Sequence, residues 1–88
     1  MKRYVLCGKY FQDRESAFRY MKEIFGFPGY AGHNLDALWD LLRDEPDRDI
    51  EITQARFIVR QMGDYGISLL DLFGDLQAIE GFNIHIYW

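Results

Sequence analysis

Two aspartates and a tryptophan lie close together in the segment HNLDALWDLLRD, residues 33–44. Asp36 and Asp40 are four positions apart, so on a helix they would be surface neighbours, which disfavours the helix by about 0.2–0.5 kcal/mol. Asp40 would also lie near the C-terminal end, where the helix dipole opposes negative charge. A sequence that accepts such penalties is typical of a functional surface.

Two plainer interpretations of this segment stay open. Asp40 could be a surface residue neutralised by Arg43, and Trp39 could be a core residue at the edge of the helix's apolar arc, although tryptophan is enriched among interface anchors. At 100° per residue the segment has one apolar arc and one polar arc. The apolar arc holds Leu35, Ala37, Leu38, Leu41 and Leu42, and the opposite arc holds Asp36, Trp39, Asp40 and Arg43.

The acidic residues are concentrated around the same segment. Residues 36–51 hold seven carboxylates and two arginines, a net −5, whereas the rest of the chain holds eight cations and seven anions, a net +1. This distribution predicts an acidic patch, beside Tyr30 and Trp39, that attracts a cationic surface. The overall net charge of −4 argues against general nucleic-acid binding.

Catalytic and metal sites are weaker interpretations. His33 and His85 could suggest a two-histidine nuclease, but an acidic neighbourhood does not suit phosphate binding, and structural roles are expected for both. The spacing of Asp36, Asp40 and Asp44 could suit magnesium, but a tryptophan and an arginine interrupt that face. We expect no catalytic residue, no metal and no cofactor.

Length and cysteine content limit the class of protein. Eighty-eight residues are expected to form one domain over residues 1–88. The single cysteine, Cys7, excludes an internal disulfide and is expected to be a small core residue. A four-residue apolar run near the N-terminus is too short for a signal peptide or a membrane span, so a cytoplasmic location without membrane contact is expected.

Strands alternating with helices predict an α/β fold, a small three-stranded and mostly parallel sheet packed with about four helices. A buried strand is expected at 4–7, a half-buried strand at 50–52 and an alternating strand at 82–88. Helices are expected at 14–25, 35–43, 55–61 and 68–80. Asp13 and Asn34 are expected to cap the first two helices, and Gly81 to end the last.

The segment resembles a known family. Pro28, Tyr30 and Gly32, followed by NLDALWD at residues 34–40, are similar to the signature of the barstar family of intracellular ribonuclease inhibitors. The similarity is strong over residues 24–42 and weaker elsewhere. It implies a three-stranded parallel sheet and a second helix that plugs the active site of a barnase-type ribonuclease.

The resemblance also implies roles for individual residues. Asp40 would mimic the RNA phosphate, held by the enzyme's arginines and histidine, and Asp36 would pair with another cation. Tyr30 would stack near the catalytic histidine, and Asp75 would supply a further acidic contact from the last long helix. The remaining expected contact residues are Gly32, Asn34, Leu35 and Trp39.

The chain departs from the family pattern at three places. Ala31 replaces a second tyrosine, residues 43–46 replace a segment that carries an aromatic contact, and Arg43 would repel a basic enzyme unless it pairs with Asp40 or Asp44. The expected partner is a basic ribonuclease or ribonuclease toxin domain, bound by a protein that is monomeric when free. The rivals are a binding module for another basic protein, which inhibits no such ribonuclease, and a small nuclease or metal-dependent hydrolase.

Overall fold

The computed structural model describes residues 2–29 and 32–88. Its strands are β1 (Lys2–Cys7), β2 (Arg48–Thr53) and β3 (Phe82–Ile86). Its helices are α1 (Arg14–Phe25), α2 (Leu35–Asp44), α3 (Arg56–Met62) and α4 (Asp64–Leu76), and a short 3₁₀ helix, η1 (Gly8–Tyr10), follows β1. No helix in this described part of the chain is both long and apolar enough to span a membrane.

The three strands form one parallel sheet in the order β1-β2-β3. In the central strand, Ile50 pairs with Tyr4 of β1 on one side and with Ile84 of β3 on the other. Each connection between neighbouring strands carries two α-helices, as parallel pairing requires a crossover. The predicted fold class, a three-stranded parallel sheet with four helices, is confirmed.

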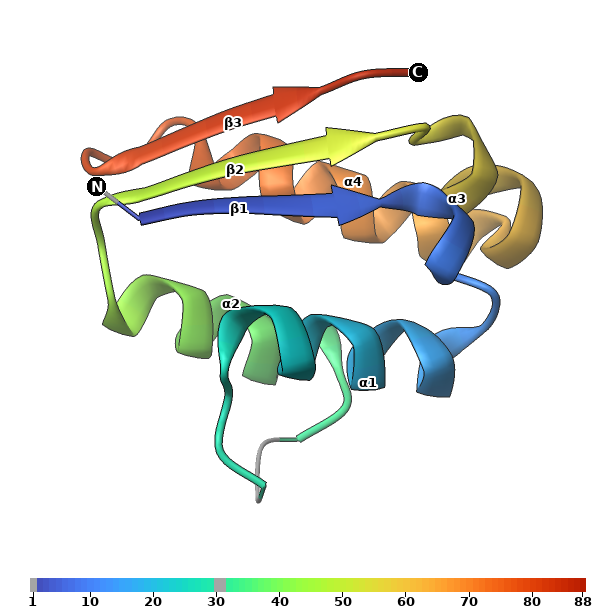
Figure 1. Ribbon diagram of the computed structural model, residues 1–88, viewed down its shortest axis with the longest axis horizontal. Helices are drawn as coiled ribbons and strands as arrows, with labels where there is room; N and C mark the ends of the chain where they lie inside the picture. Colours follow the sequence, from blue (N-terminus) through green and yellow to red (C-terminus); the bar gives the residue numbers. More distant parts are fainter. Residues whose placement is uncertain (1, 30–31) are drawn as a thin grey trace.

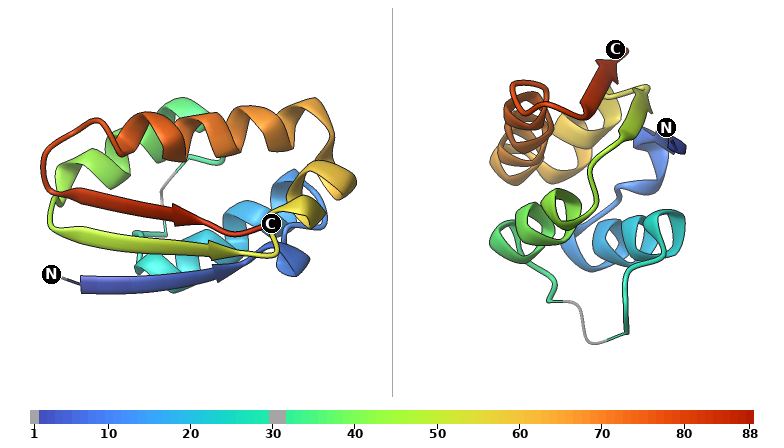
Figure 2. Two further views of the ribbon diagram at one scale, coloured as in Figure 1. Left: turned by 90° about the horizontal axis from the view of Figure 1, so that it is seen from above. Right: turned by 90° about the vertical axis from the view of Figure 1, so that its left-hand side faces the viewer.

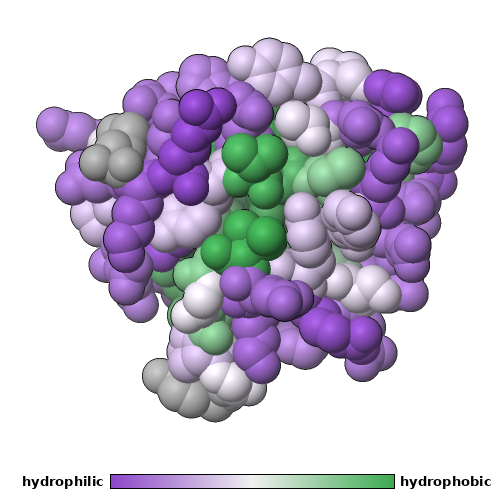
Figure 3. Space-filling model, in the orientation of Figure 1, coloured by the Kyte–Doolittle hydropathy of each residue, from purple (hydrophilic) through white to green (hydrophobic). Residues whose placement is uncertain are grey.

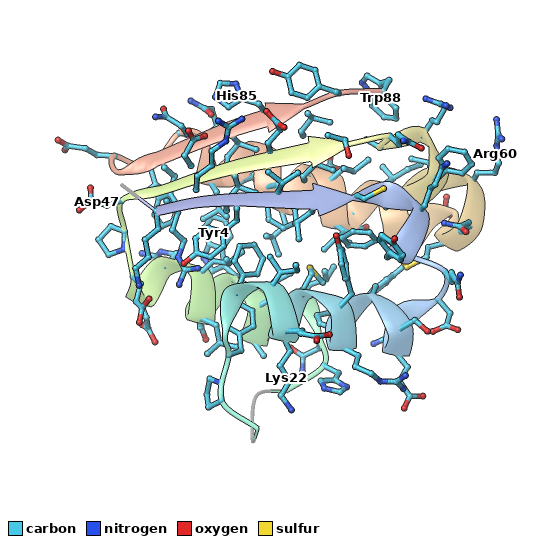
Figure 4. The ribbon with its side chains drawn as sticks, viewed as in Figure 1. Tyr4, Lys22, Asp47, Arg60, His85 and Trp88 are labelled. Atoms are coloured by element: carbon cyan, nitrogen blue, oxygen red, sulfur yellow. The ribbon has the colours of Figure 1, made fainter. Side chains whose placement is uncertain are left out.

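The helices cover one face of the sheet and leave the other face open. Figure 1 shows α1 and α2 in a layer below the strands, and the end-on view in Figure 2 shows α4 on the same side. Residues of β2 alternate accordingly, with Ile50 and Ile52 fully buried and Glu51 between them partly exposed. In Figure 4, Tyr4 points from β1 toward the helices, whereas His85 points to the open side.

The prediction that β1 is a buried strand is wrong for half of its residues. β1 is an edge strand with one open face, so Leu6 is fully buried while Val5 is 47% exposed. Cys7 follows Val5 on the open side and is only partly buried, so it is not the core residue expected. Figure 3 shows hydrophobic surface gathered where the β1 edge faces α1.

Helix α1 begins and ends where the sequence predicted. The Oδ1 of Asp13 accepts a 2.8 Å hydrogen bond from the backbone N–H of Ser16, which satisfies one of the free donors at the helix start. That bond lowers the pKa of Asp13. Tyr20 ties α1 to β1, since its hydroxyl accepts a 2.9 Å bond from the backbone N–H of Cys7, and burial raises its pKa.

The last helix differs from its predicted bounds. It begins at Asp64 instead of Ser68, because Gly63 at a φ of 58° turns the chain directly from α3 into α4. It ends at Leu76, after which residues 77–81 form turns. Gly81, at a φ of 95°, therefore does not end α4 but leads into β3.

A buried arginine fixes the C-terminal end of α2. Arg48 at the start of β2 is 3% exposed, and its Nε donates a 2.8 Å hydrogen bond to the carbonyl of Glu45, the C-cap of α2. Its guanidinium carbon lies 5.3 and 5.4 Å from the ring centroids of Tyr4 and Phe25, respectively. This contact joins β1, α1 and the end of α2, and so holds α2 in place.

Candidate functional site

The start of α2 is held by a cap and by a close approach of the preceding loop. The Oδ1 of Asn34 accepts a 2.8 Å hydrogen bond from the backbone N–H of Ala37, which confirms the predicted cap. A Cβ placed on Gly32 would lie 3.2 Å from the Ala37 Cβ, so a larger residue would crowd the loop there. Tyr30 and Ala31 lie outside the described residues, so the expected stacking contact of Tyr30 stays a prediction.

The two arcs of α2 have different environments. Leu38 and Leu42 are buried in the core, whereas Asp36, Asp40 and Arg43 are exposed. Trp39 is intermediate, since it packs against the core and also reaches the surface. The two interpretations of Trp39, core residue and surface residue, are therefore both partly correct.

The surface of α2 continues into a groove that it forms with α4. The two helices lie side by side at the left of the end-on view in Figure 2, and their side chains line a hollow of about 320 Å³ that is open to the surface. Three apolar side chains, three carboxylates and a serine line it. These residues are Leu35, Asp36, Trp39, Ser68, Asp71, Leu72 and Asp75.

The groove thus brings together four of the residues expected to contact a partner: Leu35, Asp36, Trp39 and Asp75. Asp40 is one turn beyond Asp36 and exposed, but it does not line the groove. A rotation of about 40° separates the two aspartates around the helix axis. Asp40 therefore lies beside the groove on the free surface of α2.

The alternative in which Arg43 pairs with Asp40 or Asp44 is wrong for the described residues. No ion pair among them joins Arg43 to Asp40 or Asp44. Instead the Arg43 guanidinium carbon lies 5.5 Å from the centroid of the Trp39 ring. Arg43 thus contacts the Trp39 ring, and the carboxylate of Asp40 forms no ion pair with any cation among the residues that the structure describes.

The acidic segment 36–51 does not form one patch. Its second half belongs to β2 and the turn before it, where carboxylates have cationic partners. Glu45 pairs with Arg48 at 3.2 Å, Glu51 with Arg3 at 3.1 Å, and Asp49 lies 3.6 Å from the Nε2 of His85. Asp49 and Glu51 alternate with buried residues of β2, and Glu51 is the register partner of His85 of β3, so both lie on the open face of the sheet, away from α2. The charge count predicted the excess of acid correctly but not its position.

Sequence reasoning missed Ser68 and Asp71, which line the α4 side of the groove. A signal was present, because residues 68, 71 and 75 recur at helical spacing, and Asp71 and Asp75 are four positions apart like Asp36 and Asp40. The predicted helix 68–80 already contained these three residues, but their role depends on the packing of α4 beside α2, which the sequence does not display.

The two histidines lie on opposite sides of the sheet. The ring of His33 stacks on Phe18 of α1, with centroids 5.8 Å apart, while His85 faces the open side with Asp49. They do not share one site. Within residues 2–29 and 32–88, no group of three or more His, Cys, Asp or Glu side chains is arranged to hold a metal ion.

Comparisons with known proteins show what this chain is similar to. The family model described as Barstar (barnase inhibitor) matches residues 1–87. A protein of Bacillus subtilis (strain 168), named "Putative ribonuclease inhibitor YrdF", is 29% identical over 79 residues, which cover 88% of this chain and 87% of that protein. The match of the family model over nearly the whole chain shows that the protein belongs to the barstar family.

Proposed function

We propose that this protein inhibits a ribonuclease of the barnase type by inserting the exposed surface of α2 into the enzyme's cationic active site. The observation that carries the proposal is the set of carboxylates on and beside α2, Asp36 and Asp40 above all, that have no cationic partner among the described residues. The family and the name of its Bacillus subtilis relative support the same activity.

Asp40 is the residue that mimics the RNA phosphate. A carboxylate presented by a helix resembles a phosphate in charge and in its two acceptor oxygens, so the enzyme's cations can donate charge-assisted, bidentate hydrogen bonds to it. Asn34 caps the start of α2, and Arg48 of β2 bonds to the carbonyl of Glu45 at its end, so the helix holds Asp40 in one position before binding. Preorganisation of this kind lowers the cost of association.

The surrounding residues complete the contact surface. Asp36 and Asp75 meet further cations of the enzyme, and Leu35 and Trp39 supply apolar area between them. Gly32 and Asn34 lie at the start of α2, and Tyr30 belongs to the same loop. Buried aromatic anchors among charged residues are typical of binding hot spots.

The proposal describes a monomeric binding protein, one domain over residues 1–88, without catalytic activity of its own. It acts in the cytoplasm, where it protects the producing cell from its ribonuclease or from a ribonuclease toxin domain. Its negative charge suits such a basic partner and gives it no affinity for RNA itself.

The test is a titration of barnase activity with the wild-type protein and with Asp40→Ala. We expect stoichiometric inhibition by the wild type, weakened in the variant by at least about thirtyfold, the effect of losing a residue that contributes 2 kcal/mol or more. Asp40→Asn, which keeps the shape but not the charge, separates the charge from the packing. Glu23→Ala, an exposed carboxylate of α1 outside the groove, is the matched control.

A second candidate function is binding of another basic protein or toxin nuclease without inhibition of barnase-type enzymes. The exposed Arg43 favours it, since this cation stands on the same face as Asp40 and would repel some basic surfaces. Failure of the wild type to inhibit barnase, together with Asp40-dependent capture of a different protein from the native host, would select this alternative.

A further inference from the structure

The α4 side of the groove has an electrostatic arrangement that the role of α2 does not explain. Helix α4 contains three aspartates, Asp64, Asp71 and Asp75, and no basic residue. Asp71 and Asp75 repel each other across one turn, and Asp75 in the last turn is opposed by the helix dipole. Both penalties repeat those of Asp36 and Asp40 on α2, and the two helices meet at one groove.

The carboxylates of the groove lack a partner within residues 2–29 and 32–88. No hydrogen bond or ion pair joins the side chains of Asp36, Asp71 or Asp75 to another of the described residues. The apolar side chains between them, Leu35, Trp39 and Leu72, leave a hollow of about 320 Å³. A hollow with apolar walls and an acidic rim fits a long side chain that carries a positive charge at its end.

We propose that Ser68 and Asp71 form a second cation subsite, on the α4 side of the groove, that takes an arginine side chain of the bound ribonuclease. This inference rests on the proposed function and adds a contact separate from those of Asp36, Asp40 and Asp75. Asp71 is then a residue that determines which ribonucleases bind well, because a partner without a cation at this place leaves it unpaired.

Charge and shape both favour arginine as the occupant. Ribonucleases bind a polyanion, so their substrate surfaces carry cations beyond the catalytic centre. The planar guanidinium has five donors, which can serve the carboxylate of Asp71 and the hydroxyl of Ser68 together, and it stacks on aromatic rings. Trp39, one of the residues that line the groove, supplies such a ring.

One arm of the test needs no ribonuclease. In a Trp88→Phe background, Trp39 is the single tryptophan and its fluorescence reports on the groove. We expect a saturable change on titration with arginine amide and none with citrulline amide, its uncharged isostere. Asp71→Asn should weaken arginine amide binding at least about threefold, and Glu23→Gln should not change it.

The other arm measures inhibition of barnase at several salt concentrations. Asp71→Asn should weaken inhibition about tenfold at low salt, through slower association and with a smaller dependence on salt, as expected when a charge at the rim of an interface is lost. Glu23→Gln removes the same charge outside the groove and should leave both the inhibition constant and its salt dependence unchanged.

The outcomes separate this inference from the proposed function. If the wild type inhibits and Asp71→Asn behaves like Glu23→Gln, the second subsite is wrong while the inhibitor function stands. If the wild type does not inhibit but arginine amide binds in an Asp71-dependent way, the cation subsite stands and a barnase-type ribonuclease as its source is wrong. The absence of saturable arginine amide binding together with unchanged inhibition by Asp71→Asn overturns the inference entirely.

Discussion

The carboxylates of β2 and those of the helices α2 and α4 differ in how their charge is satisfied. Near and on β2, Glu45 and Glu51 each have an arginine within 3.2 Å and Asp49 has a histidine at 3.6 Å. On the helices, the exposed aspartates have no such partner among the described residues. These carboxylates near β2 and those on the helices are thus in opposite electrostatic states.

This difference separates charges that serve the fold from charges that serve binding. A paired carboxylate contributes to the folded state and offers little to another molecule, because its partner must first be displaced. An unpaired carboxylate beside apolar surface costs the folded protein some stability, which association with a cationic partner offsets. Ribonuclease binding is therefore proposed for the helix surface and not for the open face of the sheet.

The largest effect on stability is expected from removing Arg48, the buried arginine that pairs with Glu45. Arg48→Ala removes a 3% exposed side chain that packs between Tyr4 and Phe25 and bonds to Glu45. We expect a loss of about 2–3 kcal/mol in the free energy of unfolding, from the cavity and the lost cation–π contacts. Urea denaturation followed by circular dichroism measures it.

Arg60→Ala is the matched control for this change. Arg60 also lies over an aromatic ring, with its guanidinium carbon 5.4 Å from the Phe57 centroid, but it is exposed. Its removal should cost no more than about 0.5 kcal/mol, as is usual for surface substitutions. Equal losses for the two variants would show that burial of Arg48 contributes nothing special to the fold.

The fold was predictable where local signals coincide with element boundaries. Asp13 and Asn34 each precede a run with helical periodicity, and both cap their helices as predicted. The start of α4 was not predictable in this way, because Gly66 in its first two turns reads as a loop residue. Gly66 is required there by tertiary packing, since a Cβ at this position would lie 2.4 Å from the carbonyl oxygen of Ile58 in α3.

In the candidate site, too, local spacing was predictable from the sequence and tertiary packing was not. The α2 half follows from the spacing of Asp36, Trp39 and Asp40 within one helix, which the sequence displays directly. The α4 half depends on the packing of two helices separated by a strand and a third helix, so Ser68 and Asp71 could not be assigned to a groove from the sequence alone. Pairing across strands, which neutralises Glu51, was hidden for the same reason.

Removing one unpaired and one paired carboxylate should change the stability of the free protein in opposite directions, by less than the loss of Arg48. Asp75→Asn should stabilise the free protein by about 0.3–0.5 kcal/mol, because it relieves repulsion with Asp71 and the unfavourable contact with the helix dipole. Glu51→Gln should destabilise it by about 0.2–1 kcal/mol, because it breaks the exposed pair with Arg3. Both are measured as shifts in the urea midpoint at low salt.

Added salt supplies the control, since screening should bring both variants toward the wild type. The same sign for the two variants would contradict the assignment of paired acids to the fold and unpaired acids to binding. Asp75→Asn should in addition weaken inhibition while it raises stability, a combination that a purely structural role would not produce.

The smallest effect concerns Asp13, whose carboxylate is satisfied by backbone and not by a cation. Its hydrogen bond to the Ser16 N–H lowers its pKa below the ordinary value of 3.8, so the charged cap adds stability above that pH, and this contribution is lost as the pH falls through the lowered value. Asp13→Asn keeps a neutral cap, and wild type and variant should therefore differ at pH 7 and converge as the pH falls below the ordinary pKa of 3.8. Urea midpoints of the two proteins across this range measure the difference. A gap that stays constant with pH would show that the charge of Asp13 does not contribute, and Glu23→Gln should show no comparable convergence.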